Sequence, residues 1–212
     1  MLFRKSPEKF WNLIASKYAA SPIADETAYQ KKIKIIKSYL TSGDRVLDIG
    51  CGTGTQCDDL ANRVKQVIGI DISSKLLNIA EKRRDERGIE NVQFIQTTVF
   101  DDRLETNGFN VVMAFYVLHF CENVDEVISR IYDLLKPGGL FILETVCLGD
   151  KNIASGKLIR SAGKLGFLPL INLLTTQQLE LELEQSGFYL VEKTKFSESN
   201  GEYTLIATKP LN

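Results

Sequence analysis

Histidine and paired cysteines are scarce in this chain of 212 residues. It has one histidine, and none of its four cysteines, Cys51, Cys57, Cys121 and Cys147, belongs to a C-x-x-C pair. Because zinc sites are built mostly from closely spaced cysteines and histidines, we expect no metal site. The cysteine spacing does not indicate a disulfide framework either. The sequence therefore predicts four reduced thiols in a cytoplasmic protein.

Long apolar runs and an excess of one charge are also missing. No stretch approaches the roughly 20 apolar residues that cross a bilayer, and charges and a proline stand where a signal peptide needs its apolar run. The 26 basic residues nearly balance the 27 acidic ones, which does not favour a nucleic acid as partner. With 44% hydrophobic residues, the composition is typical of a soluble globular protein with one sizeable core.

Short apolar runs alternate with helical patterns through the middle of the chain. Each run is rich in branched or aromatic residues, as strands are. The predicted strands are Val46–Ile49, Val67–Ile70, Val92–Ile95, Val111–Phe115 and Leu140–Leu143, and the predicted helices are 57–63, 73–87 and 123–135. Buried strands that alternate with helices indicate a parallel α/β sheet.

The two ends of the chain depart from this alternation. Amphipathic helices are expected at 7–19 and 25–40, and a helix at 175–186 precedes two strands, 188–196 and 202–208, that a short turn joins into an antiparallel hairpin. Segment 148–174 does not fit, and between Lys151 and Gln178 it has four basic residues and no acidic one. We predict one domain, 1–212, divided into a helical cap (1–41), a core (42–147), an inserted lid (148–174) and a C-terminal helix with hairpin (175–212).

A glycine-rich turn follows the first predicted strand. Gly50, Gly52 and Gly54 form a G-x-G-x-G pattern, which lets backbone approach a ligand closely but is a weak signal alone. Asp48 lies inside the apolar strand, where a carboxylate is costly unless a cation or donors meet it. It would repel a pyrophosphate, so it suits a ligand that carries an amino group and a sulfonium.

Asp71 ends the second predicted strand, 17 residues after Gly54. A carboxylate at this position can accept hydrogen bonds from both hydroxyls of a ribose. The alternative is that Asp71 only caps the next helix, which is expected to start near Ser73. The distance from the glycine turn favours the ribose.

Three ordered segments resemble motifs of the class I S-adenosylmethionine-dependent methyltransferases. They are Val46–Gly54, Gly69–Ser73 and Leu134–Gly139, and the resemblance covers about residues 45 to 145. The short segment Ile14–Tyr18 is similar to the entry segment of the ubiquinone/menaquinone C-methyltransferase branch. The resemblance implies a Rossmann-like, doubly wound, seven-stranded sheet with order 3-2-1-4-5-7-6 and strand seven antiparallel, and S-adenosyl-L-methionine as cofactor.

The resemblance also implies positions for the cofactor. Asp48 and the turn Gly50, Cys51, Gly52 and Gly54 would surround its methionyl part, with Cys51 as a small filler. Asp71 would bind the ribose, and the remaining expected contacts are Ile72, Thr98, Val99, Phe115 and Tyr116. The family often has an aspartate where Thr98 stands, so Thr98 or the nearby Asp101 would have to bind the adenine amino group, and Phe115 and Tyr116 would border the methyl-transfer region.

Methyl transfer needs positioning of the acceptor and exclusion of water more than it needs fixed catalytic groups. His119, after the fourth strand, is the candidate general base, and the alternative is a histidine that touches no substrate. Tyr18 is a second catalytic candidate, and Tyr29 is weighed with it; both could equally be packing aromatics. Glu144 follows the fifth strand and could face the acceptor.

The absence of certain motifs narrows the classes of methyl acceptor that the sequence allows. No Asn-Pro-Pro-Tyr, Asp-Pro-Pro-Tyr or Pro-Cys sequence indicates a nucleic-acid base, and Phe115 stands where a metal-dependent catechol enzyme has a carboxylate. His119-Phe120 replaces the Arg-Asn pair of the quinone branch. Segments 1–20 and 148–174, which lie outside the sheet, are apolar and basic and together could cover the active site. We therefore expect a small, hydrophobic acceptor, with or without an anionic group. These segments could contact a membrane surface, or could be ordinary solvated helices.

Two other function classes stay open at this point. One is a cofactor-binding sensor or partner subunit without catalysis, because this chemistry fixes few residues. The other is a nicotinamide-dependent oxidoreductase, which Asp48 and the glycine spacing disfavour. Nothing in the pattern specifies the oligomeric state.

Overall fold

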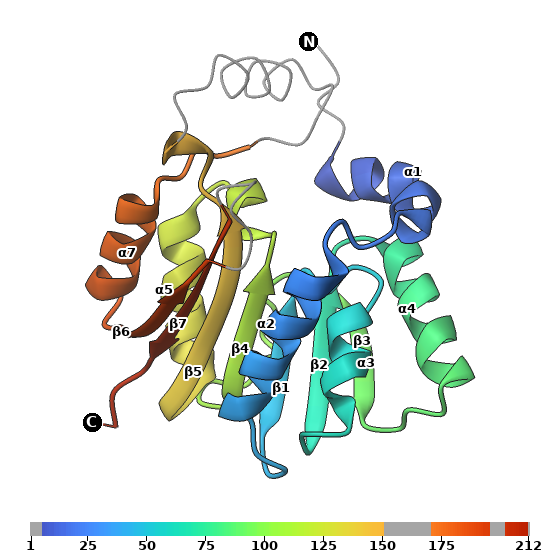
Figure 1. The fold of residues 1–212 in the computed structure, drawn as a ribbon, viewed down its shortest axis with the longest axis horizontal. Helices are drawn as coiled ribbons and strands as arrows, with labels where there is room; N and C mark the ends of the chain where they lie inside the picture. Colours follow the sequence, from blue (N-terminus) through green and yellow to red (C-terminus); the bar gives the residue numbers. More distant parts are fainter. Residues whose placement is uncertain (1–5, 151–170, 196–201, 212) are drawn as a thin grey trace.

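The structure is a computed structural model that describes residues 6–150, 171–195 and 202–211. Its centre is one seven-stranded sheet of order β3-β2-β1-β4-β5-β7-β6 (Figure 1). The strands are β1 (Arg45–Ile49), β2 (Gln66–Asp71), β3 (Val92–Gln96), β4 (Phe109–Phe115), β5 (Leu135–Val146), β6 (Tyr189–Thr194) and β7 (Glu202–Thr208). The helices are α1 (Pro7–Ala20), α2 (Glu26–Tyr39), α3 (Thr55–Ala61), α4 (Ser74–Glu86), α5 (Val124–Leu134) and α7 (Thr176–Gln185), with 3-10 turns at Leu118–Phe120 and Leu148–Asp150.

The order and the directions of the strands agree with those that the resemblance implies. β1 pairs in parallel with β2 and with β4, so that Val46 lies between Val67 and Val111. β7 runs antiparallel to both β5 and β6. The doubly wound fold and its terminal hairpin are therefore confirmed.

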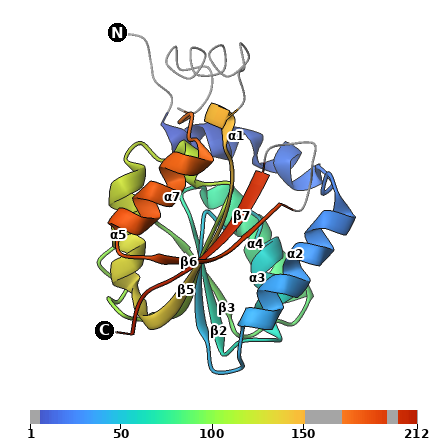
Figure 2. The same ribbon diagram turned by 60° about the vertical axis from the view of Figure 1, so that its left-hand side comes forward.

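Helices cover both faces of the sheet, as Figure 2 shows: α5 and α7 lie on one side and α2, α3 and α4 on the other. Alternate strand residues supply the two cores. Leu47 and Ile49 pack with α5 and α7, whereas Val46 packs with α2 and α3. Because both faces are buried, these strands are nearly continuous apolar runs.

Some helices and strands begin at other residues than the sequence predicts, because local turns and caps fix their starts. α3 begins at Thr55, two residues before the expected start, because Gly54 adopts a left-handed conformation directly ahead of it. β5 begins at Leu135, before the Pro-Gly-Gly turn, since Leu135 pairs with Phe109 and the register shifts afterwards. Thr175 and Gln178 form a capping box that opens α7, as the expected Thr175 or Thr176 start allows.

The two N-terminal helices occupy different places. α2 lies on a face of the sheet and contributes Ile33 and Ile36 to the core. α1 lies across the end of the sheet toward which the parallel strands point (Figure 1), where the Asn12 side-chain oxygen accepts hydrogen bonds from Ser73 Oγ (2.7 Å) and Lys75 N (3.1 Å) at the start of α4. Of these two N-terminal helices, α1 covers the end of the sheet and α2 covers one of its faces. Of the predicted lid, residues 151–170 lie outside the described residues.

A search of the described helices finds none with the length and hydrophobicity that a bilayer crossing requires. Across the same residues, no group of three or more His, Cys, Asp or Glu side chains could hold a metal ion.

Candidate active site

The glycine turn is shaped by left-handed backbone. Gly50 and Gly54 have φ of 70° and 73°. A Cβ at Gly50 would lie 2.8 Å from Val117 Cγ2, and one at Gly54 would lie 2.6 Å from Phe94 Cζ. Both positions therefore require glycine for conformation and for space. The amides of Gly50 and Cys51 donate to Ile70 O at 2.8 and 3.0 Å, which fixes the turn against β2.

Asp48 is buried, with 2% of its surface exposed. The Cys57 thiol donates to its Oδ2 at 3.2 Å. Burial raises the pKa of Asp48 to about 7, although the thiol hydrogen bond and the positive charge of Lys32 lower it. An ammonium or sulfonium placed beside this carboxylate would favour the ionised form.

Asp71 accepts hydrogen bonds from backbone amides and also lines a cavity. Its Oδ1 accepts from Ser73 N at 2.8 Å, and its Oδ2 accepts from Gly52 N at 3.0 Å. Burial raises the pKa of Asp71, and these amide bonds oppose the rise. Because a carboxylate has about four acceptor positions, Asp71 keeps acceptor capacity for a ligand beside the backbone amides that it binds. The N-cap of α4 is Ser73, whose Oγ accepts from Leu76 N at 3.2 Å, so Asp71 supports the turn before the helix and does not itself cap it. This role leaves the ligand-binding interpretation open.

Two cavities meet above the carboxyl ends of β1, β2 and β4. The first, which we call the α1 cavity, measures about 440 Å³ and is lined by Trp11, Asp71, Ile72, Thr98 and Val99. The second, the α2 cavity, measures about 690 Å³ and is lined by groups that include Lys32, Asp48, Thr55, Arg83 and Glu144. Tyr18, Gly50, Phe115 and Tyr116 line both. The two cavities therefore share one boundary.

The boundary contains a strained residue. Tyr116 has φ of 55°, which is uncommon for a residue other than glycine. Its amide donates to Glu144 O at 2.7 Å, which ties the end of β4 to β5. Strain of this kind is often found at ligand sites, where the surrounding structure holds it.

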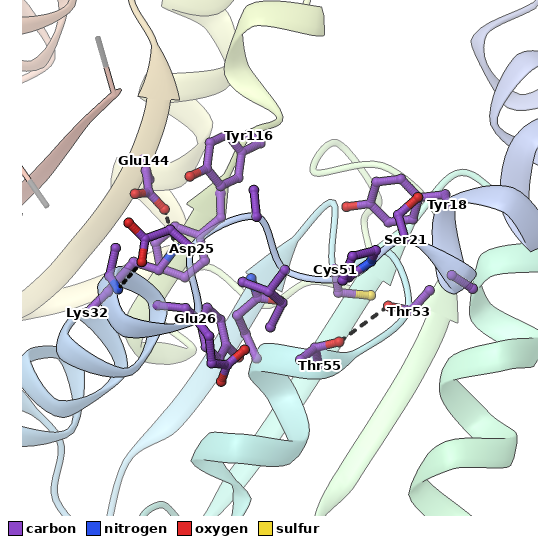
Figure 3. A pocket seen from close by; sticks show the side chains of 18 of the residues that line it. Tyr18, Ser21, Asp25, Glu26, Lys32, Cys51, Thr53, Thr55, Tyr116 and Glu144 are labelled. Atoms are coloured by element: carbon purple, nitrogen blue, oxygen red, sulfur yellow. Dashed lines mark hydrogen bonds and ion pairs between the residues drawn. The ribbon is translucent and has the colours of Figure 1, made fainter. Parts of the chain in front are cut away.

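Polar side chains of the α2 cavity lie in two sets. Figure 3 shows Lys32, Glu144 and Tyr116 on one side, and Cys51, Thr53 and Thr55 of the glycine turn on the other. Lys32 and Glu144 form a buried ion pair between α2 and β5. The side next to the glycine turn and the side next to β5 therefore differ in chemistry.

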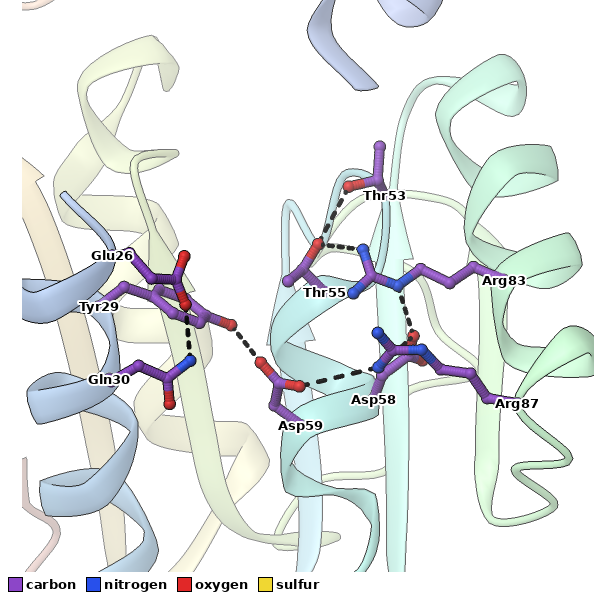
Figure 4. Close-up of polar contacts among 9 residues, drawn as sticks. All are labelled: Glu26, Tyr29, Gln30, Thr53, Thr55, Asp58, Asp59, Arg83 and Arg87. Atoms are coloured by element: carbon purple, nitrogen blue, oxygen red, sulfur yellow. Dashed lines mark hydrogen bonds and ion pairs between the residues drawn. The ribbon is translucent and has the colours of Figure 1, made fainter. Parts of the chain in front are cut away.

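A polar network supports the glycine-turn side (Figure 4). Arg83 of α4 donates to Thr55 Oγ1 at 2.8 Å, and its Nε lies 2.9 Å from Asp58 Oδ2. From α2, Tyr29 donates its hydroxyl to Asp59 Oδ2 at 2.6 Å. The network connects α2 and α4 through α3, which begins directly after the turn.

The two catalytic candidates from the sequence lie in different surroundings. Tyr18 lines both cavities, and burial together with the charges of Asp71 and Asp48 raises the pKa of its hydroxyl. His119 is buried beside Thr145, with 3.1 Å between Nδ1 and Oγ1, and is absent from the lining of both cavities. Burial lowers the pKa of His119 to about 4. The base role of His119 stays a prediction.

The structure brings most of the expected residues to these cavities. Asp48, Gly50, Cys51, Phe115 and Tyr116 line the α2 cavity, whereas the α1 cavity has Gly52, Asp71, Ile72, Thr98 and Val99. Gly54 is in neither lining and shapes the turn. Lys32 and Arg83 were not expected. A signal for Lys32 exists, because it falls three residues after Tyr29 and four before Ile36 on the buried stripe of α2.

Comparison with known proteins places the chain in a family. Residues 40–193 match the model of a methyltransferase domain. The chain is 33% identical to a ubiquinone biosynthesis O-methyltransferase of Bradyrhizobium sp. over 53% of its length and 44% of that protein. It is 27% identical to a ubiquinone/menaquinone biosynthesis C-methyltransferase of Coxiella burnetii, over 78% of this chain and 65% of that protein.

A solved structure supports the fold independently. Phosphoethanolamine N-methyltransferase 2 of Haemonchus contortus, in complex with phosphomonomethylethanolamine and S-adenosylhomocysteine, superimposes with a TM-score of 0.79 at 20% identity. The superposition covers 98% of this chain and 61% of that one.

The chain belongs to the methyltransferase domain family. The resemblance to class I S-adenosylmethionine-dependent methyltransferases, with ubiquinone-type enzymes among the relatives, is thereby confirmed, and S-adenosyl-L-methionine is the cofactor of this class. The chain spans less than two thirds of the length of either relative named above.

Proposed function

We propose that this protein transfers a methyl group from S-adenosyl-L-methionine to a small, largely apolar molecule. The observation that carries the proposal is that the two cavities meet at Gly50 and Tyr116. Asp71, which can accept from ribose hydroxyls, lines one cavity, and the buried Asp48 lines the other. The cofactor supplies a methyl carbon already activated by its sulfonium. The tasks left to the chain are to bind, to orient and to exclude water.

The α1 cavity suits an adenosine group. Asp71 offers its carboxylate to ribose hydroxyls, and Ile72 and Val99 offer apolar contact to a flat ring. Thr98, next to Val99, offers a hydroxyl to the ring edge. Trp11 of α1 covers this cavity, so the helix would limit access of water to the bound group.

The α2 cavity suits the methionyl group and the acceptor together. Asp48 lies beside the glycine turn and would hold an ammonium or sulfonium in its ionised form. Phe115 and Tyr116 stand at the boundary and would orient the two reacting groups. The remaining space, toward Lys32 and Glu144, is left for the acceptor.

Calorimetric titration with S-adenosylmethionine, S-adenosylhomocysteine and NAD tests the cofactor. Asp71→Ala removes the ribose acceptors and should weaken binding of both adenosyl ligands by about thirtyfold. Asp85→Ala is a matched control, because Asp85 is an exposed partner of Arg84 on α4. Absence of adenosyl binding, or equal weakening by both variants, would contradict the proposal.

A second arm separates an enzyme from a binding protein. Wild-type protein is incubated with radiolabelled S-adenosylmethionine and a mixture of small phenols, carboxylic acids and amines. Appearance of label in any organic product supports methyl transfer. Tight adenosyl binding without any labelled product would favour a sensor or partner subunit.

A further inference from the structure

The Lys32–Glu144 pair is the least expected feature of the α2 cavity. Both residues are buried, at 5% and 4% exposure, yet both line the cavity. Lys32 donates to Glu144 Oε2, and Thr204 of β7 donates to Oε1 at 3.4 Å. The pair is therefore held from three elements, α2, β5 and β7, on the side of the cavity away from the glycine turn (Figure 3).

Aromatic rings surround the ammonium of Lys32. Its Nζ lies 5.5 Å from the ring centroid of Tyr29, 5.1 Å from that of Phe115 and 5.4 Å from that of Tyr116. Such rings attract a cation through their negative faces. Because Lys32 already supplies this cation, an acceptor amine would bring a second positive charge into the same space.

Stability alone does not explain the pair. The desolvation cost of a buried ion pair often exceeds its Coulombic gain, and apolar residues of similar size frequently serve as well. An ion pair that borders a cavity, however, offers a donor and an acceptor side by side. A hydroxyl matches this arrangement, because its hydrogen can donate to Glu144 while its oxygen accepts from Lys32.

We propose that Lys32 and Glu144 bind an acidic hydroxyl of the acceptor, of the phenol or enol class, and that this oxygen is methylated. The inference rests on the proposed methyltransferase function. As the acceptor O–H bond breaks, its proton passes to the Glu144 carboxylate and its oxygen forms the bond to the methyl carbon. The electron pair of the broken carbon–sulfur bond stays on sulfur. Lys32 stabilises the negative charge that develops on the oxygen.

Three matched probes test the site by binding. They are 4-nitrophenol, 4-nitroanisole, which lacks the hydroxyl hydrogen, and 4-nitrobenzylamine, which carries a cation. Each is titrated into protein saturated with S-adenosylhomocysteine, by calorimetry and by visible absorption. We expect 4-nitrophenol to bind at least tenfold more tightly than the other two and to show an increased phenolate absorption when bound.

Variants of the two residues should affect nitrophenol binding differently. Lys32→Met should weaken nitrophenol binding by about tenfold or more, because a charge-assisted hydrogen bond is lost. Glu144→Gln should leave phenolate binding equal or tighter, because the ammonium loses its competing carboxylate. A merely structural pair would weaken binding in both variants. Lys32→Arg, which keeps the charge, should restore binding in part.

Affinity for S-adenosylhomocysteine is the folding control in every variant. If Lys32→Met does not fold, the variant Lys32→Met with Glu144→Leu removes both charges and should bind S-adenosylhomocysteine but not nitrophenol. Tighter binding of the amine, or unchanged nitrophenol affinity in a folded variant without Lys32, would overturn the assignment. Wild type that binds nitrophenol but not S-adenosylhomocysteine would instead overturn the proposed function and leave the hydroxyl site standing.

Discussion

The α1 and α2 cavities share Gly50 and Tyr116, yet they are built in different ways. The carboxylate that we assign to ribose in the α1 cavity, Asp71, lies on a strand end within one sequence motif and takes its geometry from nearby backbone amides. The polar pair of the α2 cavity joins Lys32 to Glu144 across 112 positions of sequence. A motif is enough to build the first site, whereas the second exists only when α2 packs on the sheet.

The largest effect is expected when the ion pair between Lys32 and Glu144 is broken. Lys32→Met leaves the Glu144 carboxylate buried without its cation and should lower the free energy of unfolding by about 3 kcal/mol. The double variant Lys32→Met with Glu144→Leu should regain most of this loss. Urea denaturation measures both. Equal losses in the single and double variants would show that the pair does not behave as a buried unit.

A smaller loss of stability is expected from a substitution in the glycine turn. Gly54→Ala should cost about 2 kcal/mol of stability, because its left-handed backbone and its contact with Phe94 both resist a Cβ. Gly88→Ala is the matched control, since Gly88 has φ of 64° but nothing within 4 Å of a Cβ. Thermal unfolding should separate the two variants. A similar cost in both would leave only backbone strain as the cause.

Asp48 predicts opposite pH trends for stability and for binding. Its folded-state pKa of about 7 lies above the usual 3.8, so the ligand-free folded state binds a proton more tightly than the unfolded state. The free energy of unfolding should therefore fall as pH rises from about 4 to about 7. Affinity for S-adenosylhomocysteine, whose ammonium needs the ionised carboxylate, should rise by up to about tenfold per pH unit below about pH 6 and level off above about pH 7.

Asp48→Asn should remove most of both trends. Urea denaturation and calorimetry at about pH 5 and pH 8 provide the two measurements. Retention of the same pH dependence in the variant would assign it to another group.

The smallest effect concerns His119, whose ring packs against Phe120 in the lining of the α1 cavity. His119→Gln should cost about 1 kcal/mol of stability through its contact with Thr145, and should leave nitrophenol affinity within about twofold. Because burial keeps the pKa of His119 near 4, the ring is neutral at physiological pH. A large loss of acceptor binding or of methyl transfer, with stability unchanged, would restore the predicted base role.

Much of the fold could be predicted because local signals were consistent with one another. Continuous apolar runs such as Val111–Phe115 marked strands buried on both faces, and the spacing of Gly50, Gly52 and Gly54 marked the turn. Lys32 was missed because lysine is normally solvated, and its position on the stripe of Tyr29 and Ile36 does not reveal a carboxylate partner.

The sequence by itself determined the alternation of strands and helices, the glycine turn and the carboxylates at Asp48 and Asp71, because each depends on residues close together in the chain. The strand order followed from the resemblance of the motifs to a known family. Tertiary structure alone decided that α1 covers one cavity while α2 supplies a cation to the other. It also decided that His119 packs beside Thr145 rather than in a cavity. The physical reason is that burial and charge pairing depend on which distant surfaces meet, and local periodicity does not specify this.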